Sequence, residues 1–193
     1  MTEFPRHLLV PANARYWAHS GPTQQAAILI PLRSFLLDEK PVETSIRLDG
    51  IALDMDDLRS QENRRHRFPA NPQEGYIDGS LYLLGRHIPV DVTELSFGTL
   101  APEGFPMRMA GAIAFAAAGI LEWPDTPVEL YFTLGLPPTP AQIDAAIALA
   151  LAATGARSVR DAGRVMAWLV REHPGWDDRR RLHERLSQHL AAR

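Results

Sequence analysis

The residues that could carry acid–base or metal chemistry are scattered along the chain. Its seven histidines lack the His-x-x-x-His spacing that places two imidazoles on one helix face, so no metal site of that kind is predicted. A β fold could bring one set together: His66, His87, Asp78, Asp91 and Glu94. A general acid–base pair needs that convergence, and the spacing alone does not supply it. We therefore predict no catalytic residue, no metal and no cofactor, and favour a protein that is not an enzyme.

The sequence also lacks the usual motifs of a nucleophilic catalytic residue. Ser80 lies in Asp78-Gly79-Ser80-Leu81, without the flanking glycines and following helix of a nucleophile elbow. The chain has no cysteine, which excludes thiolate catalysis, thiolate metal ligands and disulfides, and is compatible with a reducing cytoplasm. Its 193 residues are 46% hydrophobic and 22% charged, as in a globular protein that buries a core without such links.

The elements that would position these residues are predicted to be strands over most of the chain. From about Ala26 to Leu134 apolar residues recur with period two, which places alternate side chains on one face. The clearest hairpin is predicted over 42–55, where Asp49-Gly50 offers the positive φ of a tight turn. A shift of apolar phase along 88–97 predicts a bulge near Thr93 and Glu94. We predict that residues 1–136 form an antiparallel β-rich sandwich or partly closed barrel.

A polar, arginine-rich segment over 56–73 interrupts the strands and carries Arg64, Arg65, His66 and Arg67 at its centre. One interpretation is a loop that binds an anion or a partner protein. The other is a solvated connection between strands, because runs of charge usually face water.

Residues 139–193 are predicted to form a three-helix module, which makes the fold class α+β. Thr139 followed by Pro140 is a good cap and first turn for a helix that ends near Gly155. Ser158 with Asp161 can cap a second helix. Apolar side chains recur at helical spacing in all three segments: Ile143, Ile147 and Leu151; Val165, Met166 and Leu169; Leu182, Leu186 and Leu190.

Two boundaries inside this module are also predicted. Pro174-Gly175 should end the second helix, because proline cannot continue it and glycine accepts a left-handed conformation. Asp177 or Asp178 can cap the third.

The stretch from Ala153 to Met166, Ala-Thr-Gly-Ala-Arg-Ser-Val-Arg-Asp-Ala-Gly-Arg-Val-Met, resembles the helical tail shared by the B subunit of tRNA-dependent amidotransferases and the stand-alone YqeY proteins. The likeness covers about fifty residues, a quarter of the chain. It implies an all-helical appendage associated with binding transfer RNA rather than with amide chemistry. By the same resemblance, Arg157, Arg160 and Arg164 are the candidates for contacting a phosphate backbone.

Charge is distributed unevenly between the two parts. The tail from Thr139 holds nine arginines against six acidic residues, a net charge of +3, which leaves −6 to the remainder of a chain whose total is −3. A basic tail is a pointer to nucleic acid. An acidic β domain could contact a protein partner.

We therefore expect a non-catalytic binding or adaptor protein, with RNA as partner of the tail and a protein as partner of the β domain. Two alternatives stay open: a β-barrel that binds or processes a small molecule, and a bacterial protein-interaction or inhibitor module. The acid and proline at the start, in place of the basic and apolar runs of a signal peptide, favour a cytoplasmic protein without membrane partners.

Overall fold

The computed structural model describes residues 2–20, 24–55, 57–136, 138–173, 176 and 179–191. The chain divides into two compact units, Met1–Leu136 and Pro137–Arg193. The first is rich in strands and the second is helical, so the predicted α+β fold class is confirmed.

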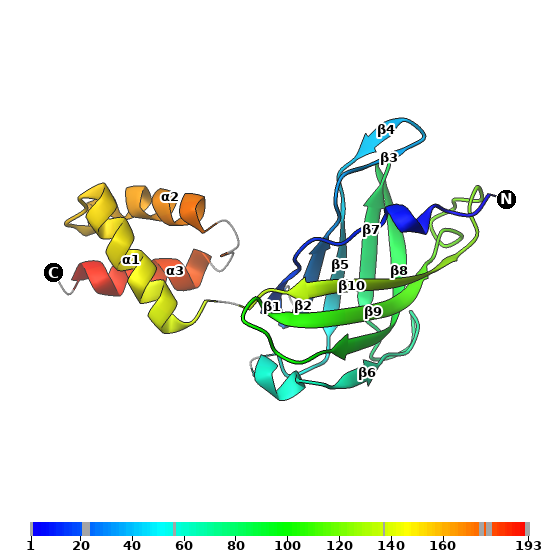
Figure 1. Cartoon of the computed structure of the whole chain (residues 1–193), viewed down its shortest axis with the longest axis horizontal. Coiled ribbons are helices and arrows are strands. Elements are labelled where there is room, and N and C mark those ends of the chain that lie inside the picture. Colours follow the sequence, from blue (N-terminus) through cyan, green and yellow to red (C-terminus); the bar gives the residue numbers. More distant parts are fainter. Residues whose placement is uncertain are drawn as a thin grey trace. The chain divides into compact units, whose positions relative to one another are not determined.

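The β unit is an antiparallel sheet that curls around its own core (Figure 1). Of the two forms left open by the sequence, the partly closed barrel is the one observed. Its strands are ordered β1 (Arg15–Ser20), β2 (Gln25–Pro31), β5 (Ser45–Ile51), β7 (Asp78–Leu83), β8 (Arg86–Phe97), β9 (Phe105–Ile113) and β10 (Thr126–Leu134). Strand β6 (Arg65–Arg67) pairs with β8, and β3 (Phe35–Leu37) pairs with β4 (Lys40–Val42). Single 3-10 turns are η1 (Arg6–Leu8) and η2 (Leu58–Gln61).

The two ends of the sheet meet at one point. Ala14, just before β1, forms a parallel bridge with Leu134 at the end of β10. The Ala14 N–H donates to Thr133 O at 2.8 Å, and the Gly135 N–H donates to Ala14 O at 2.9 Å. This seam closes the curl locally, and its donors and acceptors satisfy backbone groups that an open edge would expose.

The predicted hairpin over 42–55 is wrong. Asp49 and Gly50 lie inside β5, whose neighbours are β2 and β7. Ala26 pairs with Ile51 and Ile28 with Leu48, so two residues oppose Ala27 alone. The φ of +71° at Gly50 therefore makes a bulge rather than a turn.

The predicted bulge in β8 is confirmed. Val92 pairs with Gly111 and Glu94 with Ala110, which leaves Thr93 as the extra residue. The bulge returns Glu94 to the outer face of the sheet while Leu95 points to the core, where it is fully buried.

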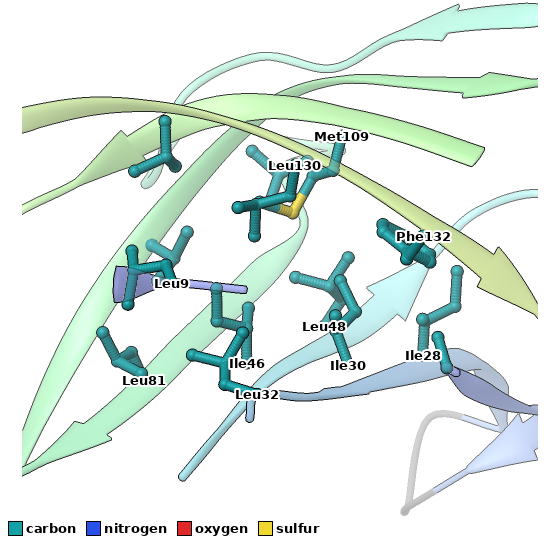
Figure 2. Close-up of a cluster of buried hydrophobic side chains, with 14 of the residues drawn as sticks. Leu9, Ile28, Ile30, Leu32, Ile46, Leu48, Leu81, Met109, Leu130 and Phe132 are labelled. Atoms are coloured by element: carbon teal, nitrogen blue, oxygen red, sulfur yellow. The ribbon is translucent and has the colours of Figure 1, made fainter. Parts of the chain in front are cut away.

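Side chains fill the interior of the curled sheet (Figure 2). Leu9, from the N-terminal segment, joins side chains of five strands and of the residue that follows β2: Ile28, Ile30, Leu32, Ile46, Leu48, Leu81, Met109, Leu130 and Phe132. Burial of this apolar set is the main stabilising contribution to the unit.

The helical unit consists of α1 (Pro140–Thr154), α2 (Ala162–Glu172) and α3 (Arg179–Ala191), with the 3-10 turn η3 (Val159–Asp161) before α2. Thr139 caps α1 and Gly155 ends it with a φ of +63°, both as predicted, and Thr139 also forms a capping box with Gln142. Asp144 on α1 accepts hydrogen bonds from Arg185 and His189 on α3. The predicted boundaries at Pro174-Gly175 and at Asp177 or Asp178 lie outside the described residues.

The helical unit has its own apolar core. Ile147, Leu169 and Leu186, one from each helix, are almost fully buried in it. In the part of the chain that the structure describes, no helix has both the length and the apolar character needed to cross a bilayer.

Candidate functional site

Four exposed arginines lie in and just before α2. Val165 and Leu169 of α2 are fully buried, whereas Arg164 and Arg171 are exposed. At about 100° per residue, Arg164 and Arg171 lie within about 20° of each other and away from the buried side. Arg157 and Arg160, also exposed, lie before α2, Arg157 outside any helix and Arg160 in the 3-10 turn η3. We call Arg157, Arg160, Arg164 and Arg171 the arginine stripe.

Asp161 organises the start of the stripe. Its carboxylate accepts hydrogen bonds from the N–H groups of Arg157 at 3.0 Å and Ser158 at 3.1 Å. These backbone contacts, led by that of Arg157, lower the pKa of Asp161. The same carboxylate pairs with the Arg164 guanidinium at 2.8 Å. Ser158 and Asp161 therefore cap the segment as predicted, although its first turn is η3 and α2 begins only at Ala162.

The guanidinium groups of Arg157 and Arg160 make no ion pair with any residue in the described part of the chain. Arg164 retains donors beyond its Asp161 contact, and among the described residues Arg171 pairs with its neighbour Glu172 alone, at 2.8 Å. Exposed guanidinium groups with unused donors are suited to binding phosphate, which they can contact through two parallel hydrogen bonds. Arg171 was missed from the sequence, because it lies beyond the motif that carries the family resemblance.

Three aromatic rings lie at the end of the stripe. His173 stacks on Trp176 with ring centroids 4.1 Å apart and planes at 12°. Trp168 meets His173 edge-on at 6.3 Å. All three side chains are only partly buried. No function was predicted from the sequence for Trp168, His173 or Trp176.

The residues of the predicted anion or partner loop do not all lie in a loop. Arg65, His66 and Arg67 form β6, and they pair with Ser96, Leu95 and Glu94 of β8. The centre of the segment is therefore a short strand rather than a loop.

The side chains of this segment point to different environments. His66 donates to Gln61 Oε1 at 2.9 Å and packs edge-on against Phe97, and burial lowers its pKa. Arg65 pairs with Glu94. Only Arg64 and Arg67 keep exposed guanidinium groups outside such contacts, so the four residues do not form one basic surface.

A ladder of charges crosses the outer face of β6, β8, β9 and β10. Glu94, whose side chain is 8% exposed, lies between Arg65 and Arg108. Arg108 also pairs with Glu129, which accepts a hydrogen bond from Tyr131. The hydrogen bond from Arg65 lowers the pKa of Glu94, and the one from Arg108 lowers that of Glu129 to about 2. These opposite charges neutralise one another and cross-link strands.

The acid–base set considered from the sequence is not assembled. Asp78 and Asp91 are register partners on β7 and β8, but His87 packs against the Tyr82 ring and His66 faces Phe97. Within the described ranges, no group of three or more His, Asp or Glu side chains is arranged to hold a metal ion.

Two open grooves lie on the β unit. One, of about 650 Å³, runs between the β7–β8 turn and the segment 119–123. The other, of about 580 Å³, is lined by Arg47, Asp49 and Asp78 among others. Arg47 is already held there by Asp49 and lies 5.8 Å from the centre of the Trp17 ring.

Comparisons of the chain with protein-family models, with curated proteins and with solved structures found no match. The resemblance of the helical tail therefore rests on the motif from Ala153 to Met166 alone.

Proposed function

We propose that this chain is a non-catalytic RNA-binding adaptor whose helical unit contacts RNA through the arginine stripe. The observation that carries the proposal is the exposure of Arg157, Arg160, Arg164 and Arg171 in and just before α2, with Arg164 and Arg171 on the face away from its buried side. Such a row of guanidinium groups can neutralise several phosphates of one strand. The expected cytoplasmic location would supply the RNA.

The uneven charge supports a division of roles between the units. Residues before Thr139 carry a net charge of −6, which repels a polyanion. Residues 139–193 carry a net charge of +3. The β unit would then serve the second half of an adaptor role by contacting a protein. A ligand inside the barrel is not proposed, because buried side chains occupy that interior.

The test is the affinity of the full-length chain for transfer RNA as a function of salt. If the stripe contacts phosphates, the logarithm of the binding constant falls linearly with the logarithm of salt concentration. Replacing Arg157, Arg160 and Arg164 together by glutamine should make that slope shallower by about 2, since each phosphate contact contributes roughly 0.7 on single-stranded nucleic acid.

A matched control removes the same charge elsewhere. Arg33, Arg59 and Arg86 are exposed on the β unit, and their triple replacement by glutamine gives the same net charge as the stripe variant. The control should keep the wild-type slope. Equal losses in both variants, or the absence of salt-dependent binding by the wild type, would refute the proposed function.

A further inference from the structure

The aromatic rings at the end of the stripe carry an inference that rests on the proposed function and refines it. We propose that Trp168, His173 and Trp176 form a stacking platform for unpaired bases, so that the helical unit prefers single-stranded RNA to duplex. We call these three residues the aromatic platform.

The spacing of α2 places arginines and aromatics in one row. Trp168 follows Arg164 by four residues and precedes Arg171 by three, so the three side chains are neighbours on the helix surface. His173 then packs on Trp168, and Trp176 packs on His173. A strand whose phosphates follow the stripe would bring its bases to these rings.

The backbone holds the platform in place. The His173 N–H donates to Leu169 O at 2.9 Å, and the Trp176 N–H donates to His173 O at 3.0 Å. His173 and Trp176 are therefore joined by a backbone hydrogen bond as well as by the stacking of their rings. A preorganised ring loses little conformational entropy when a base stacks on it.

Trp168 and Trp176 pack against the apolar core of the helical unit, and a stacking role uses the part of their surface that this packing leaves exposed. Val165 and Leu169 on the same helix are fully buried, but Trp168, His173 and Trp176 all keep part of their surface in water. Bases in a duplex are stacked on one another and hide their faces, whereas unpaired bases can stack on tryptophan or histidine. Arginine beside the rings supplies the phosphate contacts that such sites combine with stacking.

The experiment compares two probes on the full-length chain at one salt concentration: a single-stranded oligouridine and an RNA duplex with the same number of nucleotides. We expect the wild type to bind oligouridine at least 10-fold more tightly. Trp176→Ala should weaken oligouridine binding by about 5- to 150-fold and leave duplex binding unchanged, because stacking on one ring has an effect of that size.

Two further variants separate stacking from folding. Trp176→Phe keeps an aromatic face, so it should retain most of the oligouridine affinity while losing the part of the tryptophan fluorescence quenched by the probe. Tyr82→Ala removes a 61% exposed ring from the β unit and should change neither affinity. Circular dichroism of each variant reports whether the helices persist.

The outcomes separate this inference from the proposed function. Equal affinity for oligouridine and duplex, or equal losses for both probes in Trp176→Ala, overturns the stacking platform and leaves RNA binding intact. No salt-dependent binding of either probe by the wild type overturns both.

Discussion

At the scale of single residues, Glu94 is the most constrained charge of the β unit. It is buried on the outer face of the sheet and contacts two guanidinium groups, and Ser96 donates to it at 3.0 Å. A buried carboxylate is stable only with such partners, because burial disfavours the charged form.

The charge ladder makes stability depend on pH. The pKa of Glu129 falls from its ordinary value of 4.5 to about 2 on folding, so its contribution is present above about 4.5 and lost as pH decreases toward 2. Thermal unfolding followed between pH 6 and pH 2 should show this decline, and Glu129→Gln should remove part of it. The contribution is modest, since Glu129 is 46% exposed. Glu103→Gln, exposed and outside the ladder, should leave the decline unchanged.

Gly104 is a residue that the close approach of the start of β9 to the end of β10 demands. It precedes β9 with a φ of +133°, and a Cβ atom there would lie 2.2 Å from Leu134 O. Gly104→Ala should therefore lower the free energy of unfolding by roughly 2–4 kcal/mol, measured in urea. At Gly75, which has a φ of +84° and no atom within 4 Å of a built Cβ, alanine should cost about 1 kcal/mol. Equal costs at both sites would contradict a steric role for Gly104.

At the scale of elements, helix ends were more predictable than strand ends. The capping box at Thr139 and the left-handed Gly155 follow from local residue types, which act within one turn of the chain. Asp49-Gly50 has equally strong local chemistry, but a positive φ serves a bulge as well as a turn, and only the pairing of β5 with both β2 and β7 decides between them. The bulge at Thr93 was predictable, because the apolar residues of β8 occupy even-numbered positions before it and odd-numbered positions after it.

The capping box is expected to set the stability of the first turn of α1. Thr139→Ala removes the acceptor for the Gln142 N–H, which it binds at 3.2 Å, and should destabilise the helical unit by about 1 kcal/mol. Amide hydrogen exchange in residues 140–143 should accelerate correspondingly. Thr139→Ser keeps the hydroxyl and should restore near wild-type exchange; failure of that rescue would argue against a capping effect.

At the scale of the whole molecule, the order of strands and the functional surface were the least predictable features. The charge ladder joins residues from four strands, and the sheet closes through Ala14 and Leu134, which no periodic pattern marks. In the candidate site, Arg157, Arg160 and Arg164 came from a motif, whereas the aromatic platform depends on the packing of His173 against Trp168 and Trp176. Sequence reports local spacing, and these features depend on tertiary packing.

Two separate apolar cores imply that the units can lose structure separately. Leu186 is fully buried in the core of the helical unit. Leu186→Ala should reduce the stability of that unit by about 2–5 kcal/mol, a large share for so small a core. Hydrogen exchange should accelerate across α1, α2 and α3 and stay unchanged in the β unit. Equal acceleration in both would show that the units unfold as one.

The seam between Ala14 and Leu134 also has a consequence for synthesis. The two residues are 120 positions apart, so at 5–20 residues per second Ala14 is made about 6–24 s before its partner. During that interval the backbone N–H and C=O of Ala14 lack their partners at residues 133 and 135 and could pair with another nascent chain. The seam is a single bridge rather than a ladder, so few backbone groups are exposed in this way before residues 133–135 are made.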